Sequence, residues 1–269
     1  MMSGPRRSMI TVTAVAWVIV ASLLAGCGAD DAGADDSSGS ANGRPEGELL
    51  VFAAASLTDA FTAIEAAFEH EMPEVDVRLN FAGSATLREQ IVEGAPASVF
   101  ASADRARMDD VVEAELIAGT PVVFAANTLT IAVPTGNPGN VSAIGDFADG
   151  GLLVGACAAG VPCGDLAADV FTQAGVEPSI DTYEPDVRAL LAKIADAELD
   201  TGLVYVTDVA ARADEVESVA LPAGIETASD YPIATLFDAP NPPAAVAFVE
   251  FVLSDPGRTI LSEHGFEVP

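Results

Sequence analysis

The chain has few basic side chains, few histidines and few cysteines. Of its 269 residues, 11 are Lys or Arg and 41 are Asp or Glu, which gives a formal net charge of −30 at pH 7. A surface this acidic repels phosphate backbones, so the composition argues against nucleic-acid binding. The histidines, His70 and His264, are isolated from one another, and no second cysteine pair is present beside Cys157 and Cys163. The sequence therefore offers no ligand set for a zinc site.

Apolar runs long enough to span a membrane are also missing. The longest candidate, residues 9–24, follows Arg6 and Arg7 and ends in small residues directly before Cys27. A spanning helix needs ~20 apolar residues, whereas the apolar region of a signal peptide is shorter. Residues 1–27 resemble a bacterial lipoprotein signal peptide, which implies that Cys27 becomes the lipidated first residue of the mature chain. An uncleaved membrane anchor is the alternative.

The segment after the signal peptide has the composition of a linker. Residues 28–47 are rich in Gly, Ala, Ser and Asp and have almost no large apolar side chain, which predicts a flexible tether. The folded body is expected to begin near Glu48. We expect it to lie on the extracytoplasmic face of the cell membrane, held there by the lipid on Cys27.

Two cysteines remain once Cys27 is assigned to lipid. Cys157 and Cys163 form an even pair in a compartment that permits disulfides, so a bridge between them is favoured. Two buried or free thiols are the alternative. A catalytic dithiol is disfavoured, because five residues separate the pair instead of the two of a C-x-x-C motif.

The rest of the sequence has the pattern of an α/β protein. Apolar residues make up 50% of the chain, and strand-like runs alternate with helical segments, which predicts an open α/β sheet. The expected strands are Leu49–Ala55, Val75–Ala82, Val99–Ala101, Leu129–Val133, Leu152–Ala156 and Leu203–Val206. The expected helices are Thr58–His70, Ala85–Glu93, Asp104–Ala114, Asp165–Ala174, Val187–Ala197, Pro243–Leu253 and Gly257–His264.

Ligands of such sheets bind where strands end and helices begin. Small residues, Gly and Pro mark these junctions at residues 53–59, 81–87, 160–165 and 184–188. A helix N-terminus offers free N–H donors and a partial positive charge, so several together suit a small anion. Ser56 followed by Asp59 also has the pattern of a helix cap. Arg88 and Arg188 lie past the first helical residues, where ion pairs or solvated faces are expected.

Several stretches in a fixed order resemble a known family. They are VFAAASLTDAF, FAGSATLREQI, GAPASVFASAD, NTLTIAVP, VPCG, DVRALLAKIADAELDTGLVYVTDV and FVLSDPGRTILSEHGF, and they cover Glu48 to Phe266. Together they are similar to the molybdate-binding component of an ABC importer, the ModA type. The resemblance implies a type II periplasmic binding protein with two α/β lobes. It further implies a monomer without cofactor that holds molybdate or tungstate between the lobes and delivers it to a permease with its ATPase.

The resemblance also implies the ligand-binding residues. The family's serines fall on Ser56, in AAASL, and on Ser84, in FAGSAT. Its backbone N–H donors fall on Cys163, where this chain has P-C-G in place of P-A-G, and on Val187 in D-V-R. Its tyrosine hydroxyl falls on Tyr205, after the G-L-V strand. A bridge from Cys157 to Cys163 would stiffen the ligand turn.

The same resemblance suggests where the lobes divide. Lobe 1 is expected to comprise residues 48–127 and 230–269, and lobe 2 residues 128–229, with two crossing strands as a hinge. Tyr183 and Tyr231 are expected to be structural residues in loops beside proline.

Three other functions remain as alternatives. A sensor or adhesion lipoprotein would use the same fold without transport. Another alternative is binding of another tetrahedral oxyanion such as sulfate, which differs from molybdate mainly in size. Phosphate is disfavoured, because Asp186, the best acceptor for its proton, belongs to a turn. The remote alternative is a serine-dependent hydrolase, but Ser56 and Ser84 lack a G-x-S-x-G motif and no histidine lies at the junctions.

Overall fold

The computed structural model describes residues 44–269. The predicted signal peptide, the lipid site at Cys27 and most of the predicted tether lie outside these residues. Within the described part, no helix combines the length and the apolar character needed to cross a membrane.

Strands and helices alternate through most of the described chain, as expected. The strands are β1 (Gly47–Ala54), β2 (Val75–Ala82), β3 (Val99–Ala101), β4 (Ile117–Pro134), β5 (Val154–Cys157), β6 (Thr182–Glu184), β7 (Thr201–Tyr205), β8 (Val216–Val219) and β9 (Ala228–Leu236). The α-helices are α1 (Thr58–Glu71), α2 (Ser84–Val92), α3 (Arg105–Glu113), α4 (Pro162–Ala174), α5 (Val187–Ala195), α6 (Val206–Ala211), α7 (Pro242–Leu253) and α8 (Asp255–Glu263). Short 3-10 helices occupy Ala55–Leu57 (η1) and Ile144–Ala148 (η2).

The strands form a mixed sheet in the order β2-β1-β3-β9-β4-β7-β5-β6, with β8 paired to β4. Strands β1, β2 and β3 are parallel, and so are β5, β6 and β7. The long strand β4 runs antiparallel to its partners and changes them along its length. Residues 117–128 pair with β9, whereas residues 129–134 pair with β7 and β8.

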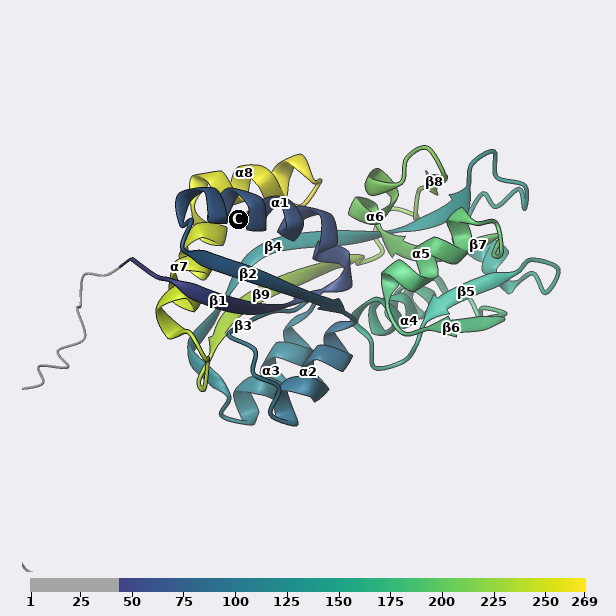
Figure 1. The fold of residues 1–269 in the computed structure, drawn as a ribbon. Coiled ribbons are helices and arrows are strands. Elements are labelled where there is room, and N and C mark those ends of the chain that lie inside the picture. Colours follow the sequence, from purple (N-terminus) through teal and green to yellow (C-terminus); the bar gives the residue numbers. More distant parts are fainter. Residues whose placement is uncertain (1–43) are drawn as a thin grey trace, which may run out of the picture. The chain divides into compact units, whose positions relative to one another are not determined.

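Helices cover both faces of the β1–β3 part of the sheet. Neighbouring residues of a strand point to opposite faces, so Val51 and Phe52 of β1 enter different cores. Val51 belongs to the core that contains Phe61 of α1 and Phe248 of α7, and Phe52 to the core that contains Leu87 of α2. Helices α1, α7 and α8 lie on one side of this part of the sheet, and α2 and α3 on the other (Figure 1).

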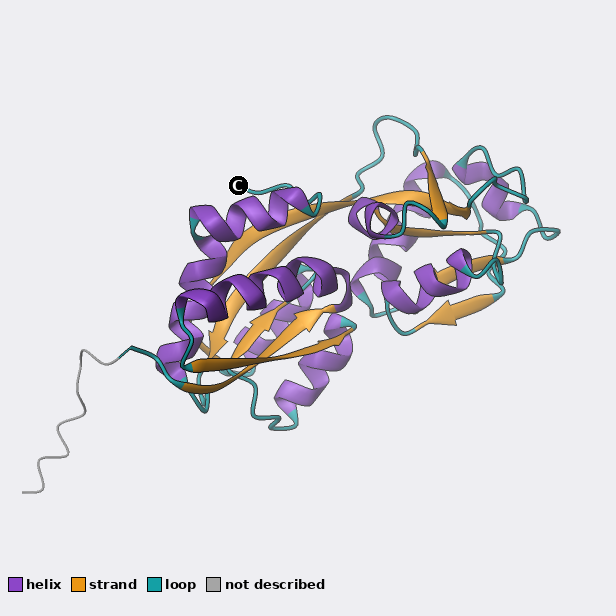
Figure 2. Cartoon of the chain, turned by 45° about the horizontal axis from the view of Figure 1, so that its top comes forward, coloured by secondary structure: helices purple, strands orange, loops and turns teal. Residues whose placement is uncertain are grey.

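Helices α4, α5 and α6 lie around the strands β5 to β8 (Figure 2). The change of partners along β4, between residues 128 and 129, falls close to the expected boundary at Asn127. This pairing supports a division into two lobes with β4 and β9 as crossing strands, which remains a prediction.

The sequence pattern missed several elements. The strand expected at Leu129–Val133 is the end of the much longer β4, and β6, β8, β9 and α6 were not expected. Pro232 hid β9, because proline lacks an N–H for the strand ladder. In the structure, Pro232 lies where the pairing with β3 ends, and its carbonyl still accepts a hydrogen bond from the N–H of Ser102 (2.9 Å).

The loop positions predicted for two tyrosines are wrong. Tyr183 lies in β6 with 63% of its surface exposed, and Tyr231 lies in β9 and is fully buried. Nearby proline was the misleading signal, since Pro185 lies two residues after Tyr183 and Pro232 directly after Tyr231, and strands tolerate proline at edges and at the ends of pairing.

Candidate functional site

The five predicted ligand residues line one cavity. Its walls are formed by Ala54, Ala55, Ser56, Gly83, Ser84, Ala103, Val161, Pro162, Cys163, Asp186, Val187 and Tyr205. The volume open to the centre of a water-sized sphere is about 10 Å³, which is about the space of one such sphere. Sites for drug-sized ligands occupy ~300–1,000 Å³. The cavity therefore suits a very small ligand.

Ser56 lies in η1, directly after β1, and is almost fully buried. Its Oγ lies 2.9 Å from the hydroxyl of Tyr231. When Tyr231 donates, the Ser56 proton is left free to point to a ligand. The expected helix cap is wrong, because the Ser56 side chain caps neither η1 nor α1. Its bond to Tyr231 spans 175 residues of sequence, which no local motif could have predicted.

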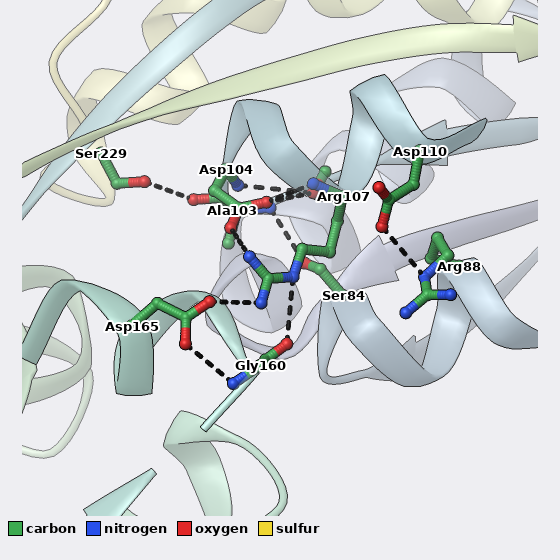
Figure 3. Close-up of polar contacts among 10 residues, drawn as sticks. Ser84, Arg88, Ala103, Asp104, Arg107, Asp110, Gly160, Asp165 and Ser229 are labelled. Carbon is green, nitrogen blue, oxygen red and sulfur yellow. Dashed lines mark hydrogen bonds and ion pairs between the residues drawn. The ribbon is translucent and has the colours of Figure 1, made fainter. Parts of the chain in front are cut away.

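Ser84 is the first residue of α2 and is 1% exposed. Its Oγ accepts a hydrogen bond from the backbone N–H of Ala103 (3.0 Å; Figure 3). The carbonyl of Ala103 in turn accepts from the hydroxyl of Ser229. Because the oxygen of Ser84 is held by an N–H donor, its own proton is available to an acceptor in the cavity.

Cys163 lies in the first turn of α4, after Pro162. A disulfide joins it to Cys157 at the end of β5, with a Cα–Cα distance of 5.8 Å. The first N–H groups of a helix have no carbonyl partner within that helix. The N–H of Cys163 is one of these, and Cys163 lines the cavity.

Val187 begins α5 on another wall of the cavity. The preceding residue, Asp186, is its N-cap, and one carboxylate oxygen accepts from the N–H groups of Arg188 and Ala189 (both 2.9 Å). The predicted turn-holding role of Asp186 is confirmed. The cap leaves the N–H of Val187, the first of the helix, without an intrahelical partner.

Tyr205 ends β7 and is 1% exposed. Among the described residues, its buried hydroxyl has no hydrogen-bond partner. Burial and the neighbouring Tyr231 raise the pKa of Tyr205 well above its usual value, so the group stays protonated. An unpartnered buried hydroxyl is costly, and a ligand oxygen in the cavity would remove that cost.

Asp208, which the sequence analysis did not predict as a site residue, forms a hydrogen bond with the backbone of Tyr205. Its carboxylate accepts from the N–H of Tyr205 (3.1 Å) and lies 3.1 Å from Nε of Arg188. The residue is fully buried, and this burial raises its pKa from 3.8 to about 7, against the opposing effect of Arg188. An acidic residue three positions after a strand end is a typical helix-start signal that could have identified it.

The cationic side chains near the site are bound to carboxylates. Arg88 pairs with Asp110 (3.4 Å), and Arg188 with Asp59 (2.5 Å) as well as Asp208. Of the two expected possibilities, an ion pair or a solvated face, both arginines form ion pairs. In residues 44–269, no Lys or Arg lines the cavity, and no cluster of His, Cys, Asp or Glu could hold a metal ion.

The raised pKa of Asp208 predicts a pH dependence of stability. Between pH ~4 and ~7 the unfolded chain has lost the Asp208 proton while the folded chain retains it, so the free energy of unfolding falls as the pH rises. The free energy of unfolding of the native chain relative to Asp208→Asn should fall over this range, which urea titrations at successive pH values would measure. The control is Asp109→Asn, which removes an exposed carboxylate on α3. If the free energy of unfolding of the native chain relative to Asp208→Asn rose with pH, this result would contradict a buried, protonated Asp208.

These features define a class of protein. A mixed sheet with helices on its faces and a small cavity between helix starts are features of a solute-binding protein with the type II periplasmic fold, which is the predicted fold class. The chain belongs to the family described as bacterial extracellular solute-binding protein, whose model matches residues 49–267. This membership makes it a solute-binding protein and not an enzyme, so the hydrolase alternative is set aside.

Individual relatives agree with this class. The chain is 38% identical over 255 residues to the molybdate-binding protein ModA of Mycobacterium tuberculosis (strain ATCC 25618 / H37Rv), covering 95% of this chain and 96% of that protein. The resemblance stated from the sequence is thus confirmed.

Solved structures show the same fold. The Azotobacter vinelandii periplasmic molybdate-binding protein matches with a TM-score of 0.73 at 19% identity, covering 82% of this chain and 99% of that one. The sulfate-binding protein SubI from Mycobacterium tuberculosis H37Rv matches with a TM-score of 0.71 at 19% identity, covering 82% and 86%. At these identities the two matches show the fold alone.

Proposed function

We propose that this protein captures molybdate outside the cytoplasmic membrane and delivers it to an ABC permease. The observation that carries the proposal is the lining of the cavity: two serine hydroxyls, a tyrosine hydroxyl and two helix starts surround a space for one very small ligand. The similarity to molybdate-binding protein ModA over 95% of this chain supports molybdate as that ligand.

Neutral donors suit a fully ionised oxyanion. Each oxygen of molybdate accepts hydrogen bonds and none carries a proton at neutral pH, so every donor in the cavity can be satisfied. A protonated anion would need an acceptor, and one oxygen of the Asp186 carboxylate already accepts from the N–H groups of Arg188 and Ala189, which holds this side chain at the start of α5. The site therefore favours molybdate, tungstate or sulfate over phosphate.

The ligand contacts proposed are those predicted from the sequence. The hydroxyls of Ser56, Ser84 and Tyr205 and the N–H groups of Cys163 and Val187 would donate to the anion. All five residues are at most 3% exposed. Burial strengthens such bonds, because water no longer competes for the donors.

The predicted location of the protein, anchored by lipid outside the cytoplasmic membrane, is also part of the proposal. Cys27 would carry lipid, residues 28–47 would serve as a tether, and the monomeric body would pass its anion to the permease and its ATPase. The disulfide between Cys157 and Cys163 supports an oxidising, extracytoplasmic compartment.

Binding of a series of anions tests the proposed ligand. We expect molybdate and tungstate to raise the melting temperature of residues 44–269, because a ligand at 100 times its Kd stabilises by ~2.7 kcal/mol. Sulfate should raise it less and phosphate hardly at all. Calorimetric titration would then give the affinities, since the one tryptophan, Trp17, lies in the predicted signal peptide.

The same series separates the candidate ligands. A larger shift with sulfate than with molybdate would favour the second candidate, a sulfate-binding protein, which fits the same donor set. No shift with any tetrahedral anion, compared with a sample without added anion, would contradict anion binding in this cavity.

A further inference from the structure

Arg107 of α3 connects two segments that line the cavity. Its side chain is 11% exposed and has partners on three sides (Figure 3). One guanidinium nitrogen donates to Asp104 (2.9 Å), Nε donates to the carbonyl of Gly160 (3.0 Å), and the third nitrogen forms an ion pair with Asp165. Asp165 also accepts from the N–H of Gly160 (2.8 Å), so the residues form a closed network.

The partners of Arg107 belong to different parts of the chain. Asp104 is the N-cap of its own helix and directly follows Ala103, the donor to Ser84. Gly160 and Asp165 are 53 and 58 residues away, at either end of the segment 160–165 that carries Cys163, which we call the Cys163 turn. Arg107 thus connects the wall that contains Ser84 with the wall that contains Cys163.

Arg107 does not supply charge to the ligand. It is absent from the cavity lining, and the carboxylates of Asp104 and Asp165 balance its charge. Its contacts are those of a residue that positions the Cys163 turn relative to the wall of the cavity that contains Ser84.

We propose that Arg107 is a clamp across the cavity and sets how long a bound oxyanion remains. The proposal rests on the proposed function. Release of an enclosed anion requires the walls to separate, which breaks the bonds of Arg107 to the Cys163 turn and leaves its bond to Asp104 intact. The guanidinium of Arg107 is nearly buried, although Asp165 beside it is 45% exposed, and we expect the loss of its hydrogen-bonded pair to act mainly on the dissociation rate. Arg107 is therefore a positioning residue for the ligand turn.

Arg188 makes a comparable contact with Asp59, but it also pairs with the fully buried Asp208. Replacement of Arg188 would remove the cation next to this buried carboxyl group, whose pKa it lowers, and would endanger folding. Arg107 is therefore the better position to substitute, because its replacement disturbs no fully buried carboxyl group.

The test compares Arg107→Gln with Arg105→Gln. Arg105 is on the same helix and pairs with Asp230 (2.8 Å), and it is 61% exposed at the side chain, so its substitution makes the same charge change away from the Cys163 turn. Chase of labelled molybdate by unlabelled anion gives the dissociation rate. We expect Arg107→Gln to release molybdate about tenfold faster and Arg105→Gln to behave like the native protein.

A second substitution removes the ion-pair partner of Arg107 in the Cys163 turn. Asp165→Asn should speed release as Arg107→Gln does, and the double variant should be no faster than Arg107→Gln alone. Additive rate effects, or release at the native rate from Arg107→Gln, would overturn the clamp. A lowered melting temperature without faster release would show a structural role only, and would overturn it equally.

A readout without ligand separates this inference from the proposed function. Backbone amides of residues 158–165 should exchange hydrogen faster in ligand-free Arg107→Gln than in the native chain, and at the native rate in Arg105→Gln. Unchanged exchange in Arg107→Gln would refute the clamp. Failure of the native protein to bind molybdate would instead refute the proposed function, and the exchange experiment would still decide the clamp.

Discussion

Replacement of Gly83 by alanine is expected to weaken molybdate binding by about fivefold to 150-fold, the range of ~1–3 kcal/mol that overpacking costs. A Cβ on Gly83 would lie 2.7 Å from the carbonyl oxygen of Pro185 and 3.4 Å from Cβ of Asp186. Pro185 and Asp186 lead into α5 and place Val187 at the cavity. The added methyl group would push the start of α5 away from the start of α2.

The backbone of Gly83 is not the reason for this effect. Its φ of −57° and ψ of 137° suit any residue, so alanine adopts the same conformation and the clash arises only across the cavity. Calorimetric titration would measure the change in Kd. The matched control is Gly145→Ala, where an added Cβ meets nothing within 4 Å. Native affinity in Gly83→Ala would contradict the close approach of the two helix starts during binding.

Removal of a serine hydroxyl from the cavity is expected to weaken binding by about 1.5–3 kcal/mol, the usual value of a hydrogen bond to a charged group. This corresponds to an increase in Kd of roughly tenfold to 150-fold for Ser84→Ala. The N–H of Ala103 would also lose its acceptor, the Ser84 Oγ. Ser56→Ala should have an effect of the same size, since its hydroxyl pairs with Tyr231 on one side and lines the cavity on the other.

Ser218→Ala provides the control for both serines, because it makes the same chemical change at an exposed position of β8. Molybdate titrations of the variants, combined with their melting temperatures, separate lost donors from lost stability. Native affinity in both Ser56→Ala and Ser84→Ala would show that the residues of the site are wrongly assigned.

Much of the fold follows from local signals in the sequence. The strand Val75–Ala82 and the strand Val99–Ala101 have the predicted bounds, and the helices begin within a few residues of the predicted positions. The signals were alternating apolar residues, followed by Gly, Ser or Pro at the junctions. The rule that ligands bind where strands end and helices begin identified the four junctions that contain Ser56, Ser84, Cys163 and Val187, whereas the family resemblance assigned these residues and Tyr205 as ligand contacts.

The partners of the site residues could not be predicted in this way. Tyr231 contacts Ser56 across 175 residues of sequence, and Arg107 contacts Asp165 across 58. Because these partners are so far apart in the chain, no local sequence pattern indicates either contact. A serine three residues before an acidic residue has the local form of a helix cap, although Ser56 caps neither helix in the structure. Only the packing of β9 beside β3 and β4 brings Tyr231 behind Ser56.

A crystal structure of the protein grown with molybdate tests the central claim most directly. Our account predicts a single ion between Ser56, Ser84, Cys163, Val187 and Tyr205, with its oxygens bound by hydroxyl and amide donors alone. An ion found at another place, or surrounded by arginine and lysine side chains, would contradict it.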